Sequence, residues 1–226
     1  MKKSPLLFIV LSFLFHFSSF SQAKQLSYLA LGDSYTIGES VNPSLRWPEQ
    51  LVDSLNAINK LSFNSPQIVA RTGWTTGELH KAIAESNISE TYDLVSLLIG
   101  VNNQYRGYDI ELYRQEFRAL LEKSIYFAGN NTERVFVVSI PNYGVTPFGI
   151  KKGEGKIRQE LLEYDKIAEQ ISSEYGIPFV NITPISERAK TDSSLIAKDQ
   201  LHPSGNMYTE WIHEILPVVK SLLSEY

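Results

Sequence analysis

Four short polar motifs of the chain could together build a site for nucleophilic catalysis. They supply a hydroxyl, donors for a negatively charged oxygen, a carboxylate and an imidazole, and they are Gly32-Asp33-Ser34, Gly73, Gly100-Val101-Asn102 and Asp199-Gln200-Leu201-His202. Each motif is common by itself. Their order, and their positions after predicted strands, favour hydrolysis by an activated serine.

Ser34 is the candidate nucleophile, because a serine hydroxyl becomes reactive when a neighbouring base takes its proton. An isolated Gly-Asp-Ser would more often cap a helix. The pair Asp199 and His202 favours catalysis, since the carboxylate can bond Nδ1 of the imidazole and leave Nε2 free for the serine. His80 and His213 lie in predicted helices without such a partner, so we interpret them as structural or solvent-facing.

A tetrahedral intermediate carries a negative oxygen that needs hydrogen-bond donors already in place. The candidate donors of this oxyanion hole are the backbone N–H groups of Ser34 and Gly73 and the side-chain amide of Asn102. Gly73 has no Cβ, so its backbone can approach a substrate closely. Two alternatives stay open: Gly73 could be only a turn residue, and Asn102 could only bridge its own loop.

The N-terminal segment differs in composition from the rest of the 226 residues. Two lysines precede an apolar run over residues 5–20, and the small residues Ser21 and Ala23 suit a cleavage site. This pattern predicts a signal peptide over residues 1–23, followed by a single domain over residues 24–226 in a secreted or periplasmic protein. A membrane anchor is the alternative, but the run is shorter than the roughly 20 residues that a span needs.

Composition and charge exclude several functional classes. The net charge of −4 disfavours nucleic acid as a partner, because that would need a basic surface. Without a second long apolar stretch, we expect no stable membrane insertion after cleavage. The absence of cysteine excludes thiolate catalysis and Cys-based zinc sites. Apart from the pair Asp199 and His202, no cluster has metal-ligand spacing, so neither a metal nor a cofactor is expected.

Short apolar runs alternate with longer helical patterns, which predicts an α/β fold with a parallel sheet. The expected strands are Leu26–Leu31, Gln67–Ala70, Leu94–Ile99, Val135–Ile140 and Pro178–Asn181. The expected helices are Trp47–Ile58, Thr76–Glu85, Ile110–Ala128, Lys156–Tyr175 and Ser204–Leu223, with a helical turn at Ile185–Ala189. The strand order 2-1-3-4-5 would bring the loops after the first three strands together, at the edge where ligands bind. Ser34, Gly73 and Asn102 lie in those loops.

These motifs resemble the sequence blocks of the GDSL, or SGNH, hydrolase family. The four matching segments are Gly32-Asp33-Ser34-Tyr35, Thr72-Gly73-Trp74-Thr75, Gly100-Val101-Asn102-Asn103 and Asp199-Gln200-Leu201-His202-Pro203. Tyr35 stands where the family often has Leu, and Asn103 where it commonly has Asp. The resemblance spans residues 31–204, whereas the Gly-x-Ser-x-Gly elbow of the α/β-hydrolases is absent.

The resemblance implies a catalytic set and a fold. It implies Ser34 as nucleophile, Asp199 and His202 as its partners, and an oxyanion hole made by Ser34, Gly73 and Asn102. It also implies a three-layer α/β/α fold, flavodoxin-like, around a five-stranded parallel sheet. No metal or other cofactor belongs to this mechanism.

The substrate is not named by the fold, because the family cleaves many esters and thioesters. Trp74 and Tyr105 lie near predicted loop ends, where aromatic rings could bind a sugar, wall a small acyl pocket or simply pack under the loops. Together with export, they favour removal of a short acyl group, such as acetyl, from a carbohydrate or another small ester through an acyl-enzyme. The alternatives are a lysophospholipase or acyl-thioesterase, a metal-dependent hydrolase and a non-catalytic ligand-binding module. A lipid substrate would need a broad groove, of which the loop Pro141–Gly149 could form one wall.

Overall fold

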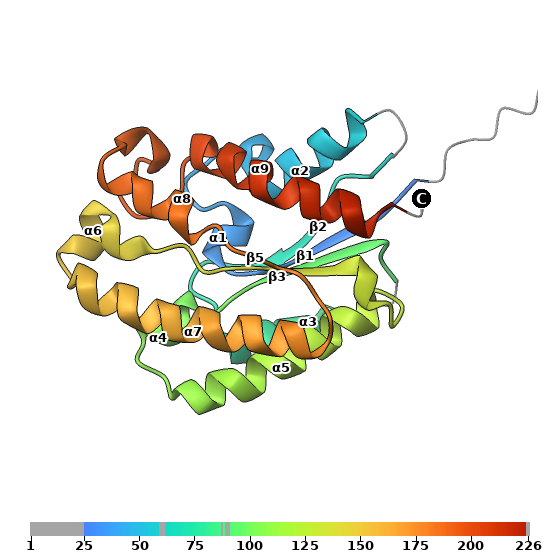
Figure 1. The fold of residues 1–226 in the computed structure, drawn as a ribbon, viewed down its shortest axis with the longest axis horizontal. Helices are drawn as coiled ribbons and strands as arrows, with labels where there is room; N and C mark the ends of the chain where they lie inside the picture. Colours follow the sequence, from blue (N-terminus) through green and yellow to red (C-terminus); the bar gives the residue numbers. More distant parts are fainter. Residues whose placement is uncertain (1–24, 59–61, 87, 89–90, 225–226) are drawn as a thin grey trace, which may run out of the picture.

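A five-stranded parallel sheet forms the middle layer of the fold, with the strand order β2-β1-β3-β4-β5 (Figure 1). The computed structural model describes residues 25–58, 62–86, 88 and 91–224, so the predicted signal peptide over residues 1–23 lies outside the described residues. The strands are β1 (Tyr28–Gly32), β2 (Gln67–Ala70), β3 (Leu94–Leu98), β4 (Val135–Val138) and β5 (Phe179–Val180). The predicted order is therefore confirmed.

Long helices cover both faces of the sheet (Figure 1). On one face lie α2 (Trp47–Asn56), α9 (Gly205–Leu222) and the shorter α8 (Thr183–Glu187); on the other lie α3 (Thr76–Glu85), α5 (Ile110–Phe127) and α7 (Glu154–Glu174). All residues of β1 and β3 are buried, as expected for parallel strands between two helical layers. This arrangement confirms the three-layer α/β/α fold. Within the described residues, none of these helices has the length and apolar character that crossing a bilayer requires.

Short helices follow the carboxyl ends of the strands, and the sequence patterns did not predict most of them. They are α1 (Ser34–Ile37), α4 (Val101–Tyr105) and α6 (Pro147–Ile150), with 3-10 turns η1 (Pro43–Leu45), η3 (Tyr143–Val145), η4 (Arg188–Lys190) and η5 (Ser193–Leu195). A further 3-10 turn, η2 (Thr132–Arg134), lies directly before β4. A helix of one turn is too short to show a hydrophobic period. The three short α-helices lie at one end of the molecule (Figure 1), where they frame the candidate site.

The expected strands are one or two residues too long at some ends, for a physical reason. Apolar residues continue past the last ladder pair, but other groups take their backbone hydrogen bonds. Beyond β4, the N–H of Ile140 donates to Oδ1 of Asp165 on α7, at 2.8 Å. Before β1, Leu26 forms only an isolated bridge with Phe63.

Candidate active site

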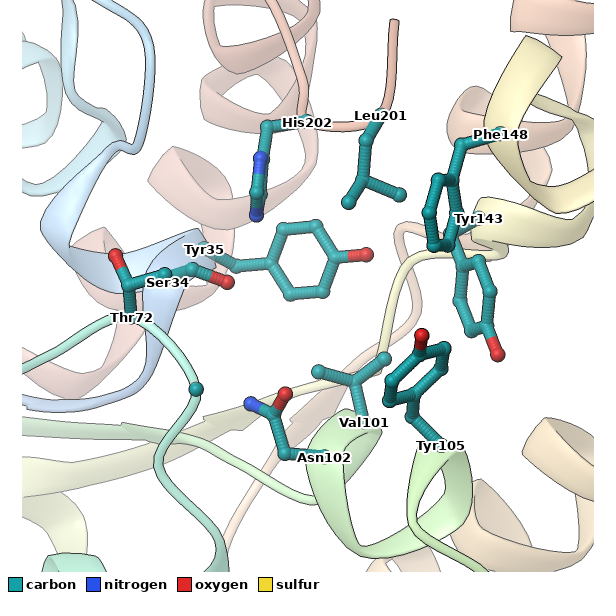
Figure 2. A pocket seen from close by; sticks show the side chains of 11 residues that line it. Ser34, Tyr35, Thr72, Val101, Asn102, Tyr105, Tyr143, Phe148, Leu201 and His202 are labelled. Carbon is teal, nitrogen blue, oxygen red and sulfur yellow. The ribbon is translucent and has the colours of Figure 1, made fainter. Parts of the chain in front are cut away.

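The loops after β1, β2 and β3 meet at one cavity of about 230 Å³. Ser34, Gly73, Asn102 and His202 all line it, so the fold brings together four of the five predicted site residues (Figure 2). The other lining residues are Tyr35, Thr72, Val101, Tyr105, Tyr143, Phe148 and Leu201. Asp199 completes the set through its contact with His202.

Ser34 is the first residue of α1 and follows β1 after a single intervening residue, Asp33. The helix cap is Asp33, whose Oδ1 accepts the N–H of Tyr35 at 3.0 Å. Ser34 therefore does not serve as the cap, and its side chain faces the cavity. Complete burial raises the pKa of Asp33 to about 7, against the lowering effect of its backbone hydrogen bonds.

His202 and Asp199 form the predicted pair. Nδ1 of His202 lies 2.6 Å from Oδ2 of Asp199, and Oδ1 of Asp199 accepts the N–H groups of Leu201 and His202, each at 3.0 Å. The hydroxyl of Ser40 also donates to Oδ2, at 2.6 Å. Burial acts to raise the pKa of Asp199, but the hydrogen bonds from Ser40, His202 and Leu201 outweigh it and hold the pKa at about 2. The carboxylate is therefore charged at neutral pH.

Two backbone hydrogen bonds with Ala197 hold the turn that carries Asp199 and His202. Its residue Gln200 has a φ of +65°, and the N–H of Gln200 donates to the carbonyl of Ala197 at 3.0 Å. The N–H of Ala197 in turn donates to the carbonyl of His202 at 2.8 Å. These bonds set the ring of His202 beside Ser34 on one side of the cavity (Figure 2).

The side chains of Ser34 and His202 are not hydrogen-bonded to each other in the part of the chain that the structure describes. Such bonds often shorten only when substrate binds. The other two histidines of the described residues, His80 and His213, are exposed and do not line the cavity, as predicted. His202 is thus the ring available to Ser34.

Gly73 is held in a conformation that favours glycine. Its φ is +86°, and a Cβ added there would meet only Nη2 of Arg106, at 3.7 Å, so backbone conformation rather than space selects the residue. Arg106 donates from Nη2 to the carbonyl of Gly73 at 2.5 Å. Nδ2 of Asn102 donates to the carbonyl of the next residue, Trp74, at 2.9 Å. The carbonyls of Gly73 and Trp74 are thus bonded to Arg106, the C-cap of α4, and to Asn102 of α4. The N–H of Gly73, by contrast, has no protein acceptor within the described residues.

Asn102 owes its position to the tight turn that starts α4. Gly100 has a φ of +133°, and a Cβ there would lie 2.7 Å from the ring of Tyr113, so only glycine fits. The next residue of the helix, Asn103, is buried: its Oδ1 accepts the N–H of Thr76 at 3.0 Å, and its Nδ2 donates to Oγ1 of Thr76 at 2.7 Å. Asn103, which stands where the family commonly has Asp, thus joins α4 to the start of α3.

An aromatic wall, which we define as Tyr105, Tyr143 and Phe148, closes the cavity opposite Ser34 (Figure 2). Their ring centroids lie 6.1 to 6.4 Å apart. Tyr105 was predicted from the sequence; Tyr143 was not, because only the fold brings η3 to this site. The hydroxyl of Tyr143 donates to Oε1 of Gln104 at 2.9 Å, which fixes its ring.

Trp74 and the loop Pro141–Gly149, both named from the sequence, are placed differently relative to the cavity. Trp74 does not line the cavity; it is half-buried and packs against the core. Val145, in the loop Pro141–Gly149, is buried, whereas Phe148 of the same loop reaches the cavity. Among the described residues, no group of three or more His, Cys, Asp or Glu side chains could hold a metal ion.

The chain is similar to several known esterases. Over 142 residues it is 27% identical to an acetylxylan esterase of Geobacillus stearothermophilus, an alignment that covers 59% of this chain. The alignment spans 62% of that relative's length, which is less than two thirds.

Solved structures share the fold. The esterase EstA from Pseudoalteromonas sp., in a structure inhibited by monoethylphosphonate, superposes with a TM-score of 0.65 at 20% identity, covering 88% of this chain and 100% of that one. A catalytic mutant of Axe2, an acetylxylan esterase from Geobacillus stearothermophilus, superposes with a TM-score of 0.65 at 20% identity, covering 88% and 96%.

The family comparison covers most of the chain. The GDSL-like Lipase/Acylhydrolase family matches residues 30–209, a range that contains all four motifs singled out from the sequence. The same range includes every strand of the sheet except the first two residues of β1, and all five predicted site residues. The chain therefore belongs to the GDSL-like lipase/acylhydrolase family.

Proposed function

We propose that this protein is a carboxylic ester hydrolase in which Ser34 is the nucleophile and His202 the general base. The observation that carries the proposal is the 2.6 Å contact between Nδ1 of His202 and Asp199, made at the cavity that Ser34 also lines. This contact keeps a proton on Nδ1 and leaves the lone pair of Nε2 free to accept the serine proton.

The proposed reaction has two half-reactions. Oγ of Ser34 attacks the ester carbonyl carbon while Nε2 of His202 takes the hydroxyl proton. The N–H groups of Ser34 and Gly73 and the amide of Asn102 bind the negative oxygen. When the tetrahedral intermediate collapses, His202 returns the proton to the departing alcohol and the acyl group stays on Ser34. In the second half-reaction water takes the place of the serine hydroxyl: it attacks the acyl carbon while Nε2 of His202 takes its proton. Collapse of this second intermediate releases the acid and returns the proton to Ser34.

The proposed substrate carries a short acyl group, such as acetyl, on a carbohydrate or another small ester. Two observations support this. The cavity measures about 230 Å³ and is closed by the aromatic wall, and both the sequence match and the structural match from Geobacillus stearothermophilus are named for acetylxylan. Tyr105, half exposed at this wall, is the proposed contact for the alcohol part of the substrate. A role for Trp74 in binding stays a prediction, since it lies next to Gly73 but outside the lining.

A pair of variants tests the mechanism. Ser34→Ala and His202→Ala should each abolish hydrolysis of p-nitrophenyl acetate while circular dichroism stays unchanged. Asp199→Ala should be milder, because a carboxylate that orients the imidazole typically contributes roughly 10⁴-fold, against roughly 10⁶-fold for the serine or histidine. Turnover at the wild-type level in either of the first two variants would refute the assignment.

Acyl length tests the substrate class. We expect the kcat/KM for p-nitrophenyl esters to fall as the acyl group lengthens beyond acetyl, and acetylated xylo-oligosaccharides to release acetate. A preference for long chains would favour the lysophospholipase or thioesterase alternative instead. Binding of sugar esters without turnover would favour the non-catalytic binding module. Loss of activity in the presence of a metal chelator would favour the metal-dependent hydrolase.

Location is part of the proposal. The segment over residues 1–23 is proposed to act as a signal peptide that directs the protein to the periplasm or medium. N-terminal sequencing of the exported protein tests this, with Lys24 as the expected first residue. An intact Met1 on the exported protein would contradict it.

A further inference from the structure

We propose that Ser40 is a positioning residue that holds the carboxylate of Asp199 in line with His202, an inference that rests on the proposed function. Ser40 lies in the turn after α1, 159 residues before Asp199 in the sequence. No motif marks it, and it does not line the cavity. It would act through Asp199 without touching the substrate.

The hydrogen bonds of Asp199 show what Ser40 adds. The backbone N–H groups of Leu201 and His202 occupy Oδ1, and both belong to the same turn as Asp199. Oδ2 is shared: Nδ1 of His202 lies 2.6 Å from it, and the hydroxyl of Ser40 donates to it at 2.6 Å. Ser40 is therefore the donor that ties the carboxylate to a different part of the chain, and it fixes the oxygen that orients the imidazole.

The backbone of Ser40 indicates that the hydroxyl is used. Its φ is +65°, in the left-handed region, where glycine is unstrained and residues with a Cβ are not. A serine in this conformation needs a compensating interaction, and its hydroxyl makes only the bond to Asp199 among the described residues. Non-glycine residues held in such conformations cluster at functional sites.

The same turn also contacts the nucleophile and the oxyanion loop. The N–H of Glu39 donates to the carbonyl of Ser34 at 3.0 Å, and the Glu39 carboxylate accepts a hydrogen bond from Thr72, which precedes Gly73. A shift of this turn would therefore move Ser34 relative to the oxyanion donors. Through Ser40, the turn extends this connection to Asp199.

The negative charge of Asp199 supports the same role for Ser40. Among the hydrogen bonds that lower the pKa of Asp199 to about 2 against the effect of burial, the one from Ser40 has the largest effect. A hydrogen bond to a charged acceptor is stronger than one between neutral groups. Removing the hydroxyl leaves Oδ2 with the imidazole as its only partner among the described residues, so the carboxylate gains freedom to rotate away from the imidazole.

Two substitutions separate the hydroxyl from the backbone. Ser40→Gly and Ser40→Ala both remove the hydroxyl, but only glycine accepts a φ of +65° without strain. We expect both variants to lower kcat for p-nitrophenyl acetate by roughly 10-fold to 100-fold, with KM within about twofold of wild type. Ser44→Ala, at an exposed serine of η1 outside the site, is the matched control and should keep wild-type kcat.

A double-mutant cycle with Asp199 is the second readout. If Ser40 acts through the carboxylate, Ser40→Gly should have no further effect on kcat once Asp199→Asn is present. Wild-type kcat in Ser40→Gly, or a loss confined to Ser40→Ala, would overturn the proposal, since backbone conformation would then be all that matters. Additive losses in the cycle would overturn it as well.

Labelling by a phosphonate ester separates the two levels of inference. If wild-type protein is not labelled at Ser34, the proposed function fails and Ser40 has no nucleophile to support. If wild type is labelled and Ser40→Gly is labelled at the same rate, only the role of Ser40 fails. We expect slower labelling in Ser40→Gly, by the same factor as the loss in kcat.

Discussion

The carbonyl oxygen of Trp74 accepts a hydrogen bond from Nδ2 of Asn102, at 2.9 Å. A side-chain amide has two N–H groups, and this bond occupies one of them. It therefore fixes the plane of the amide while the second N–H stays free for a substrate oxygen, and Figure 2 shows the nitrogen turned toward the loop that contains Gly73. The bond to Trp74 joins Asn102 to the loop after β2 rather than within its own loop, and it is compatible with the proposed catalytic role.

The first prediction concerns this amide. Asn102→Ala should lower kcat for p-nitrophenyl acetate by roughly 10²-fold to 10³-fold with little change in KM, because the donor acts mainly on the developing negative charge. Steady-state kinetics on both proteins measures it. Asn102→Asp, of similar size but with a negative charge, should not restore activity. A loss smaller than about threefold in Asn102→Ala would exclude the amide from the oxyanion hole.

The second prediction concerns acyl length. The ring of Phe148 packs against Tyr105 and Tyr143 in the aromatic wall, opposite Ser34. Phe148→Ala should open this wall and raise the ratio of kcat/KM for butyrate over acetate esters roughly tenfold, as expected when a hydrophobic pocket gains room for methylene groups. Tyr126→Ala, at an exposed aromatic residue of α5, is the control. An unchanged ratio in Phe148→Ala would show that the acyl group binds elsewhere.

Local signals account for the parts of the fold that were predicted well. The helix α3 has the predicted bounds, because Thr75 and Glu78 form a capping box that is visible in the sequence itself. The strands were found from short apolar runs, and their order was the doubly wound one that would bring the loops carrying the motifs together. Ser34, Asp199 and His202 could be singled out as candidates because their motifs are compact and carry reactive side chains.

Long-range contacts account for what was missed. Ser40 has no neighbouring motif, and its partner Asp199 lies 159 residues away, so only the folded chain brings them together. Tyr143 reaches the cavity because η3 packs beside α7, which no local pattern encodes. The connection from Asn103 to Thr76 likewise depends on how α4 meets α3.

The third prediction explains why Asn stands at position 103. Oγ1 of Thr76 accepts from Nδ2 of Asn103 and donates its own proton to Glu116. In Asn103→Asp, the new carboxylate would compete with Glu116 for that one proton. We expect a loss of about 1–3 kcal/mol in the free energy of unfolding, the typical cost of an unsatisfied buried polar group. Urea denaturation measures the difference between the two proteins.

A second substitution checks this explanation. In a Glu116→Gln background, the amide can donate to Thr76, which frees the hydroxyl proton for the carboxylate introduced by Asn103→Asp. The loss caused by Asn103→Asp should then be smaller than in the wild-type background. Equal losses in the two backgrounds would mean that competition for the Thr76 proton is not the cause.

The fourth prediction follows from Asp165, a buried carboxyl of α7. Its Oδ1 accepts the N–H of Ile140 at 2.8 Å, and its Oδ2 accepts from Thr183 at 3.3 Å. Burial raises its pKa to about 7, which these hydrogen bonds offset only in part and the nearby charge of Glu169 increases. In the unfolded chain an aspartate titrates at about 3.9, so the folded state binds more protons than the unfolded state between these two values.

The sign of the pH effect follows from this difference. A group with a raised pKa stabilises the folded state below the unfolded pKa, and that contribution is lost as the pH rises through the folded pKa. Because of Asp165, the free energy of unfolding should therefore fall as the pH rises from about 4 to about 7, by at most about 1.4 kcal/mol per pH unit. Asp33, with a pKa also raised to about 7, acts in the same direction.

Asp165→Asn should reduce this pH dependence without removing it. The amide oxygen can still accept the N–H of Ile140, and the amide nitrogen can donate to Thr183, so the hydrogen bonds of the site persist. The variant should be more stable than wild type at pH 8, with a smaller decline from pH 4 to pH 7 in urea denaturation. Asp53→Asn, at an exposed position of α2, controls for the loss of one negative charge. Parallel curves for Asp165→Asn and wild type would mean that Asp165 does not take up a proton on folding, and the slope would then come from other carboxyls whose pKa burial raises, such as Asp33 and Glu49.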